Sequence, residues 1–221
     1  MSYDSLEAIK STLADPNPVK WLFTGDSITH GAFHTLGHRD YAEHFAERVR
    51  WELRRVRDGV IKSAVNGWRI TDLAADLEWN VLQYRPQIVS LNFGMNDCTG
   101  GAAGLTAFKV GYHEVLRRIR LETGAAIILH TPPGLLPLAP TRQDHIASYA
   151  EAVREIALET GAVLVDHFAN WEAASKREVM VYWQSDAFHP NEYGHRAMAH
   201  LLFERLGIFD AQSAVCRLFV P

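Results

Sequence analysis

The sequence predicts an α/β fold in which five parallel strands form one sheet with helices on both faces. Five short apolar segments stop abruptly, most of them at glycine, asparagine, aspartate or proline. Segments with apolar residues at helical spacing separate them. Strands that alternate with helices favour a parallel sheet, because each crossover helix returns the chain to the same edge. A length of 221 residues suits one buried core, so we expect a single domain over residues 1–221.

The predicted strands are short and apolar. Each precedes a loop that breaks a regular backbone, such as Asn66-Gly67 after the second strand. In chain order the predicted strands cover 21–23, 60–65, 87–93, 125–129 and 162–165.

The predicted helices carry apolar residues on one face. The first, over 5–13, is ended by Pro16 and Pro18, so we expect residues 1–19 to form an N-terminal packing helix and a linker. The other predicted helices cover 41–56, 70–82, 105–119, 146–157, 168–177 and 191–206. Residues 100–104 and 131–134 are expected to be loops, since they are rich in glycine and alanine or in proline.

Composition narrows the functional classes. Apolar residues make up 48% and charged residues 22% of the chain, as in ordinary soluble proteins. A net charge of -4 without a run of lysine or arginine argues against nucleic acid as a partner. No segment is apolar for long enough to predict a membrane span or a signal peptide. Two cysteines are too few for a disulfide framework, so we expect a cytoplasmic protein.

Three loops follow the first three predicted strands: Gly25-Asp26-Ser27, Asn66-Gly67 and Gly94-Met95-Asn96. Ligands of open parallel sheets bind beyond the carboxyl ends of the strands. In a flavodoxin-like strand order, 2-1-3-4-5, these loops meet at one edge. Ser27 would then lie beside the backbone N–H of Gly67 and the side-chain amide of Asn96. A serine with such donors is what acyl transfer requires, because negative charge develops on the former carbonyl oxygen.

A base for this serine is expected late in the chain, just before the last predicted helix. Asp186 and His189 stand three positions apart there. A turn in this segment can present the carboxylate to one imidazole nitrogen while the other faces Ser27. This division of roles is that of Ser-His-Asp catalysis.

These motifs resemble those of the SGNH subgroup of GDSL hydrolases. Gly25-Asp26-Ser27 matches the nucleophile block and Asn66-Gly67 the glycine block. Gly94-Met95-Asn96-Asp97 matches the G-x-N-D block, and Asp186-Ala187-Phe188-His189 matches the D-x-x-H block. The four blocks occur in order and span most of the chain. The glycine block departs from the commoner G-x-S-G form, because Trp68 follows Gly67 directly.

The resemblance implies a three-layer α/β/α sandwich with a flavodoxin-like sheet and an esterase that uses neither metal nor cofactor. It implies that Ser27 is the nucleophile, His189 the base and Asp186 the residue that orients it. The implied oxyanion donors are the backbone N–H groups of Ser27 and Gly67 and the side chain of Asn96.

Several neighbouring residues have simpler interpretations. Asp26 and Asp97 are expected to tie loops together through backbone N–H groups. Cys98 has no histidine partner in view, so we expect a small buried residue. Trp68 and Trp183 flank the motifs and could stack on a sugar ring, with ordinary packing as the alternative.

Three histidines, His30, His34 and His38, recur every four residues, which on a helix would indicate a metal site. Gly31 and Gly37 disfavour a helix there, so we expect no metal, and a place at the rim of the pocket stays open.

The sequence therefore predicts a serine esterase that hydrolyses short-chain carboxylic esters through an acyl-enzyme. The preferred substrates are O-acetyl esters of carbohydrates, and the expected partner is a small-molecule or oligosaccharide ester. A thioesterase or lysophospholipase activity, and a non-catalytic binding protein on the same fold, are the alternatives. The acyl chain, the alcohol and a homo-oligomeric state stay open.

Overall fold

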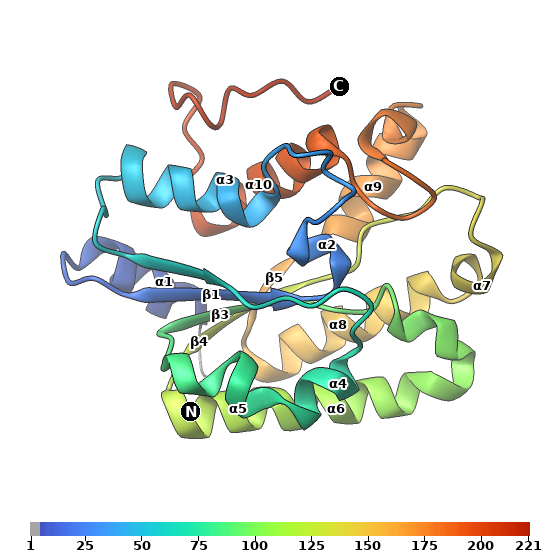
Figure 1. The fold of residues 1–221 in the computed structure, drawn as a ribbon, viewed down its shortest axis with the longest axis horizontal. Helices are drawn as coiled ribbons and strands as arrows, with labels where there is room; N and C mark the ends of the chain where they lie inside the picture. Colours follow the sequence, from blue (N-terminus) through green and yellow to red (C-terminus); the bar gives the residue numbers. More distant parts are fainter. Residues whose placement is uncertain (1–4) are drawn as a thin grey trace.

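A computed structural model describes residues 5–221 and contains one parallel sheet (Figure 1). The strand order is β2-β1-β3-β4-β5, which confirms the predicted flavodoxin-like order, and every adjacent pair is parallel. The strands are β1 (Lys20–Gly25), β2 (Gly59–Lys62), β3 (Ile88–Asn92), β4 (Ala126–His130) and β5 (Val163–Val165).

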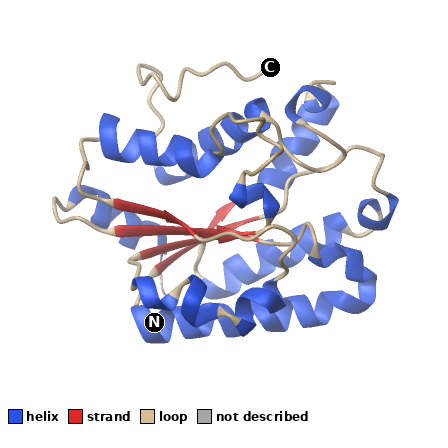
Figure 2. Cartoon of the chain, in the orientation of Figure 1, coloured by secondary structure: helices blue, strands red, loops and turns tan. Residues whose placement is uncertain are grey.

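Helices cover both faces of the sheet, as the sequence predicts (Figure 2). Figure 1 shows α3 and α10 on one side of the strands and α4, α6 and α8 on the other. The longer helices are α1 (Ser5–Ala14), α3 (Tyr41–Glu47), α6 (Gly101–Thr123), α8 (Ile146–Thr160), α9 (His167–Lys176) and α10 (Glu192–Leu206). The shorter ones are α2 (Ser27–His30), α4 (Ile70–Ala75), α5 (Leu77–Asn80) and α7 (Pro140–Gln143). Single turns of other helix types cover Arg48–Glu52 (π) and Leu82–Tyr84, Asp97–Gly100 and Met180–Trp183 (3₁₀).

Two predicted helices are interrupted. The helix expected over 41–56 passes into a π-helical turn at Arg48 and ends before Arg54, whose backbone is left-handed (φ 61). The helix expected over 70–82 breaks at Asp76, where φ is −121. The Asp76 carboxylate accepts a hydrogen bond from Asn80 Nδ2 at 2.8 Å, so a local polar contact accompanies the break.

The predicted start of the helix after the third strand is also wrong, because glycines near its start allow close packing of two helices. Residues 101–104, expected to be a loop, form the first turn of α6. The Tyr149 hydroxyl of α8 donates a hydrogen bond to Gly101 O at 2.9 Å. A Cβ atom on Gly104 would lie 2.7 Å from that hydroxyl oxygen. The small residues therefore allow α6 and α8 to approach closely.

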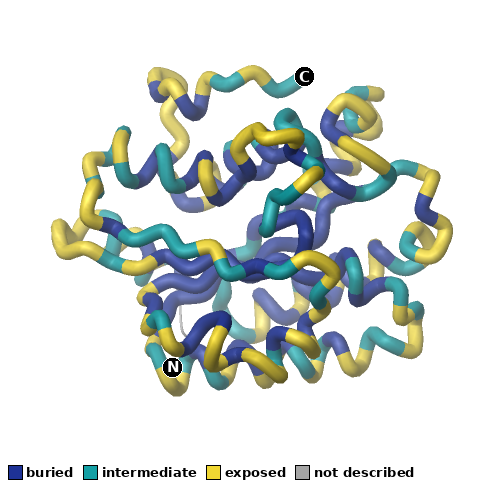
Figure 3. Tube along the Cα trace, viewed as in Figure 1, coloured by how far each residue is buried: buried dark blue, intermediate teal, exposed yellow. Residues whose placement is uncertain are grey.

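The core lies on both faces of the sheet, where the inner surfaces of the helices meet the strands (Figure 3). Every residue of β3 and β4 is buried, as expected for central parallel strands. On one face, the rings of Trp21 and Phe45 pack edge to face with centroids 4.9 Å apart. No helix within residues 5–221 is long and apolar enough to cross a membrane.

A group of buried histidines lies in this core. Ser90 Oγ and His130 Nε2 are 2.7 Å apart, and His130 Nδ1 and His167 Nε2 are 2.8 Å apart. His195 accepts a hydrogen bond from Tyr41 N at 3.3 Å, and its ring stacks on the Tyr41 ring. Burial lowers the pKa of His167 and of His195 to about 3, so both rings are neutral at pH 7.

We expect the substitution His195→Gln to flatten the acid dependence of stability. Between pH 6.5 and 4, unfolded His195 binds a proton that the folded residue does not, so falling pH lowers the free energy of unfolding. One such group contributes a slope of up to about 1.4 kcal/mol per pH unit, and the variant should lose it. Urea unfolding at pH 7, 6 and 5, followed by tryptophan fluorescence, measures the slope.

The exposed His113 on α6 provides the matched control. His113→Gln should keep the slope of the unmodified protein. Buried Asp26 and Asp97, whose pKa values burial raises, act with the opposite sign, but they are present in all three proteins. Equal slopes for the unmodified protein and His195→Gln would contradict the assignment of a neutral, buried His195.

Candidate active site

Ser27 lies two residues beyond the carboxyl end of β1, a strand that pairs with both β2 and β3. Asp26 caps the short helix α2, and its Oδ1 accepts a hydrogen bond from Ile28 N at 3.0 Å. The turn needs glycine at position 25, since a Cβ atom there would lie 2.6 Å from Asn92 O of the neighbouring strand. The strand end and the cap together fix the position of the Ser27 hydroxyl.

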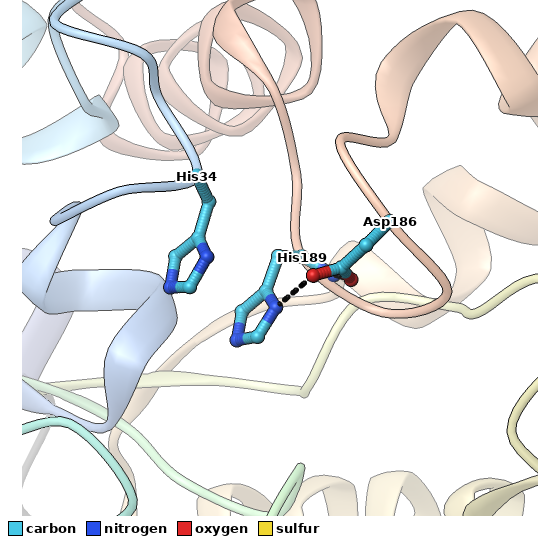
Figure 4. A group of neighbouring side chains, drawn as sticks. All are labelled: His34, Asp186 and His189. Atoms are coloured by element: carbon cyan, nitrogen blue, oxygen red, sulfur yellow. Dashed lines mark hydrogen bonds and ion pairs between the residues drawn. The ribbon is translucent and has the colours of Figure 1, made fainter.

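His189 reaches Ser27 from the loop before α10. His189 Nε2 lies 2.9 Å from Ser27 Oγ, although 162 positions separate the two residues. His189 Nδ1 lies 2.7 Å from Asp186 Oδ2 (Figure 4). Asp186 Oδ1 also accepts hydrogen bonds from the backbone N–H groups of Phe188 and His189, both at 2.9 Å. The three predicted residues therefore form a continuous hydrogen-bonded series.

The electrostatics of this series suit a neutral base. Burial and, to a smaller extent, the charge of Arg142 lower the pKa of His189, and the hydrogen bond and charge of Asp186 offset this only in part. Partial burial tends to raise the pKa of Asp186, but hydrogen bonds from Phe188 N and His189 outweigh it, and the pKa is lowered. At neutral pH, an imidazole next to an ionised carboxylate can accept a proton from a hydroxyl group.

The loops after β2 and β3 meet, as the predicted strand order requires. Asn96 Nδ2 donates a hydrogen bond to Trp68 O at 3.1 Å. Gly67 has φ 79, a left-handed conformation that glycine adopts without strain. Among residues 5–221, no hydrogen bond occupies the N–H of Gly67 or that of Ser27. The roles of these N–H groups and of Asn96 as oxyanion donors stay predictions.

Arg142, which the sequence analysis did not single out, fixes this arrangement from α7. Its Nε donates a hydrogen bond to Met95 O at 3.1 Å, and its Nη2 donates one to Asn96 Oδ1 at 3.4 Å. Its guanidinium lies over the Phe188 ring, 4.0 Å from the centroid. With Oδ1 held by arginine, the Asn96 amide presents its nitrogen to the loop of Trp68. Arg142 belongs to no motif, so only the folded loop reveals it.

Of the two aspartates expected to tie loops together, Asp97 does so, whereas Asp26, among residues 5–221, only caps α2 through Ile28 N. Asp97 Oδ1 accepts a hydrogen bond from Ile70 N, and its Oδ2 accepts one from Gly94 N, both at 3.0 Å. Burial raises the pKa of Asp97 to about 6 and that of Asp26 to about 7. Cys98 is buried, as expected, and its burial raises the pKa of the thiol to about 12. An unionised, covered thiol is a poor nucleophile.

Of the three histidines whose role the sequence left open, His34 lies in the site. Its ring stacks on that of His189, with centroids 3.4 Å apart and an angle of 5° between the planes. His34, Asp186 and His189 have potential metal-ligand atoms within 4.8 Å of one another, and neither His30 nor His38 belongs to this group. The nitrogen lone pairs of each ring lie in the plane of that ring. Because the two planes are nearly parallel, these lone pairs do not converge on one ion. The geometry therefore favours a stacked pair over a metal site.

The two tryptophans considered for sugar stacking differ. Trp68 is half-buried beside Asn96, so stacking stays a prediction for it. Trp183 is only 2% exposed, packs edge to face on Trp171, and donates a hydrogen bond to Pro221 O at 3.2 Å. Its faces are covered by the core, which favours the packing alternative and corrects the proposed substrate contact.

Comparisons with known proteins identify the family and similar structures. A model of the GDSL-like lipase/acylhydrolase family matches residues 23–197. The structure of Axe2, an acetylxylan esterase from Geobacillus stearothermophilus, superimposes with a TM-score of 0.67 at 27% identity, covering 89% of this chain and 97% of that chain. LAE5, an alpha/beta hydrolase enzyme from the metagenome of Lake Arreo, gives a TM-score of 0.70 at 21% identity, covering 87% and 96%.

A curated Mycoplasma pneumoniae protein, described as uncharacterized, is 29% identical over 119 residues, or 53% of this chain. The match spans only 13% of the length of that relative.

We expect Asp186→Asn to lower the pKa of His189 further. The carboxylate raises this pKa through its charge and its hydrogen bond to Nδ1, and an amide supplies no charge. A titration of the His189 ring signals by NMR measures the change. Asp144→Asn, which removes an exposed carboxylate after α7, is the control and should leave the pKa of His189 unchanged. An unchanged His189 titration in Asp186→Asn would contradict the coupling.

Proposed function

Because the chain belongs to the GDSL-like lipase/acylhydrolase family and is an ester hydrolase, we propose that it is a serine esterase for short acyl groups. We propose O-acetyl groups of carbohydrates as its substrates. The observation that carries the mechanism is the 2.9 Å separation of Ser27 Oγ and His189 Nε2, with Asp186 on the opposite ring nitrogen.

In the proposed acylation step, Ser27 Oγ attacks the ester carbonyl carbon. His189 Nε2 accepts the hydroxyl proton, and its Nδ1–H continues to donate to Asp186. Collapse of the tetrahedral intermediate breaks the bond between the carbonyl carbon and the alcohol oxygen. The alcohol oxygen takes the proton that His189 received from Ser27. The acyl group stays on Ser27.

The carbonyl oxygen becomes negatively charged in this step and needs hydrogen-bond donors. We propose that the N–H groups of Ser27 and Gly67 and the Asn96 amide supply them. Both N–H groups are unoccupied within residues 5–221. Asn96 Nδ2 carries two hydrogens, of which one goes to Trp68 O and one is left for substrate.

Deacylation in the proposed mechanism is the reverse of acylation, with water in place of the alcohol. His189 removes a proton from water, which attacks the acyl carbon, and then protonates Ser27 Oγ as the ester bond breaks. Free carboxylic acid and the resting enzyme result.

The preference for carbohydrate acetates rests on similarity to an acetylxylan esterase at 27% identity over most of both chains. The half-buried indole of Trp68, next to Asn96, would offer an aromatic surface to a sugar ring.

We expect the unmodified protein to hydrolyse p-nitrophenyl acetate and acetylated xylo-oligosaccharides and to act more slowly on p-nitrophenyl esters of longer acids. Ser27→Ala should abolish all of these activities without lowering the melting temperature, since the substitution removes one buried oxygen atom. Activity that survives in Ser27→Ala would overturn the mechanism. A preference for long acyl chains would overturn the substrate class and leave the mechanism in place.

We expect Asn96→Ala to lower kcat by about 10²–10³-fold, the usual effect of removing one oxyanion donor. Asn96→Asp keeps the shape of the side chain and its oxygen toward Arg142 but lacks the amide donor, so a similar loss is expected. Steady-state kinetics with p-nitrophenyl acetate measure both variants. Full activity in Asn96→Asp would show that the amide nitrogen is not a donor to the substrate.

A further inference from the structure

We propose that His34 is a positioning residue that acts through His189: its ring covers one face of the base and stabilises the imidazolium formed when the Ser27 proton arrives. This inference rests on the proposed function and adds a residue that lies outside the four sequence motifs.

The first observation is the geometry of the two rings (Figure 4). Their centroids are 3.4 Å apart and their planes differ by 5°, so one face of His189 is fully covered by the ring of His34. The edge of His189 is engaged as well, by Ser27 Oγ on one nitrogen and by Asp186 Oδ2 on the other. His34 therefore contacts the base without competing for either nitrogen.

The second observation is that the loop holding His34 is strained and anchored. Phe33 and Leu36 have left-handed backbones (φ 63 and φ 51), and their side chains are 84% and 79% exposed. Bulky residues adopt this conformation only where the surrounding structure imposes it. Ser185, one residue before Asp186, donates a hydrogen bond from Oγ to His34 O at 2.7 Å. Exposed apolar side chains thus flank His34 and Thr35, and Thr35 anchors the loop by donating a hydrogen bond from Oγ1 to Gly31 O at 2.8 Å.

The third observation is the charge state of His34. Burial, and then the neighbouring His189, lowers the pKa of His34 to about 4. At neutral pH the ring is an uncharged aromatic group that presents its electron-rich face to His189. Such a face attracts a cation more strongly than it attracts a neutral ring. His34 should therefore stabilise the protonated state of His189, which exists only during the reaction, more than the resting state.

Two other roles fit less well. A second base would need a nitrogen directed at Ser27 or a carboxylate partner, but His34 Nε2 is buried without a hydrogen-bond partner among residues 5–221. A metal ligand would need lone pairs that converge, and the parallel rings direct theirs along separate planes.

The test compares His34→Phe with His34→Leu. Both remove the imidazole nitrogens and keep an apolar group over His189, but only phenylalanine keeps an aromatic face. We expect kcat for p-nitrophenyl acetate to fall about 10-fold in His34→Leu at an unchanged KM and to stay within about 3-fold in His34→Phe. The pKa of His189, titrated by NMR in the resting proteins, should be lower in His34→Leu than in His34→Phe.

Equal kcat and equal His189 titration in the two variants would overturn the proposal, because His34 would then only fill space. Equal and large losses in both would also overturn it, since the imidazole nitrogens would then be required. The NMR comparison needs no turnover, so it can fail independently of the proposed esterase activity, which Ser27→Ala tests.

Discussion

The hydrogen bond between Ser27 Oγ and His189 Nε2 is the interaction on which the site depends. It joins the end of β1 to the loop before α10, so it exists only when the two ends of the fold are in place. Gly25 brings the serine loop against Asn92, and the Asp186 carboxylate shapes its loop through the N–H groups of Phe188 and His189. Each partner is thus positioned by its own local turn, and the packing of α10 against the sheet brings the two turns together.

Parallel strand order places the predicted oxyanion donors beside this pair. β2 and β3 both adjoin β1, so the loops that follow them meet next to Ser27. Asp97 then ties the β3 loop to the start of α4 through Ile70 N, and Asn96 bonds to Trp68 O. Arg142 holds the oxygen of the Asn96 amide and lies over Phe188. Backbone and side-chain contacts therefore connect the donor side of the site with the base side, and movement of one loop would disturb both.

The sequence predicted the parts of this arrangement that local patterns encode. Apolar segments that stop abruptly predicted the strands, and the resemblance to GDSL hydrolases implied their order. Short motifs predicted the Ser27–His189–Asp186 series. Helix ends were less predictable, because the break at Asp76 and the start of α6 at Gly101 depend on side-chain contacts with Asn80 and Tyr149. His34 and Arg142 could not be assigned, since each reaches the site from a loop whose course depends on tertiary contacts.

The distribution of charge explains why such a site can separate charge during the reaction. Asp186 is ionised and its side chain is 49% exposed, whereas that of His189 is only 11% exposed. The negative charge therefore stays in contact with water, and the base beside it starts out neutral. In the proposed mechanism, proton transfer from Ser27 creates a cation between the Asp186 carboxylate and the face of His34, where it would be stabilised from two directions. In the same mechanism the matching negative charge would form on the side of Asn96, so the two new charges would arise where opposite partners are already fixed.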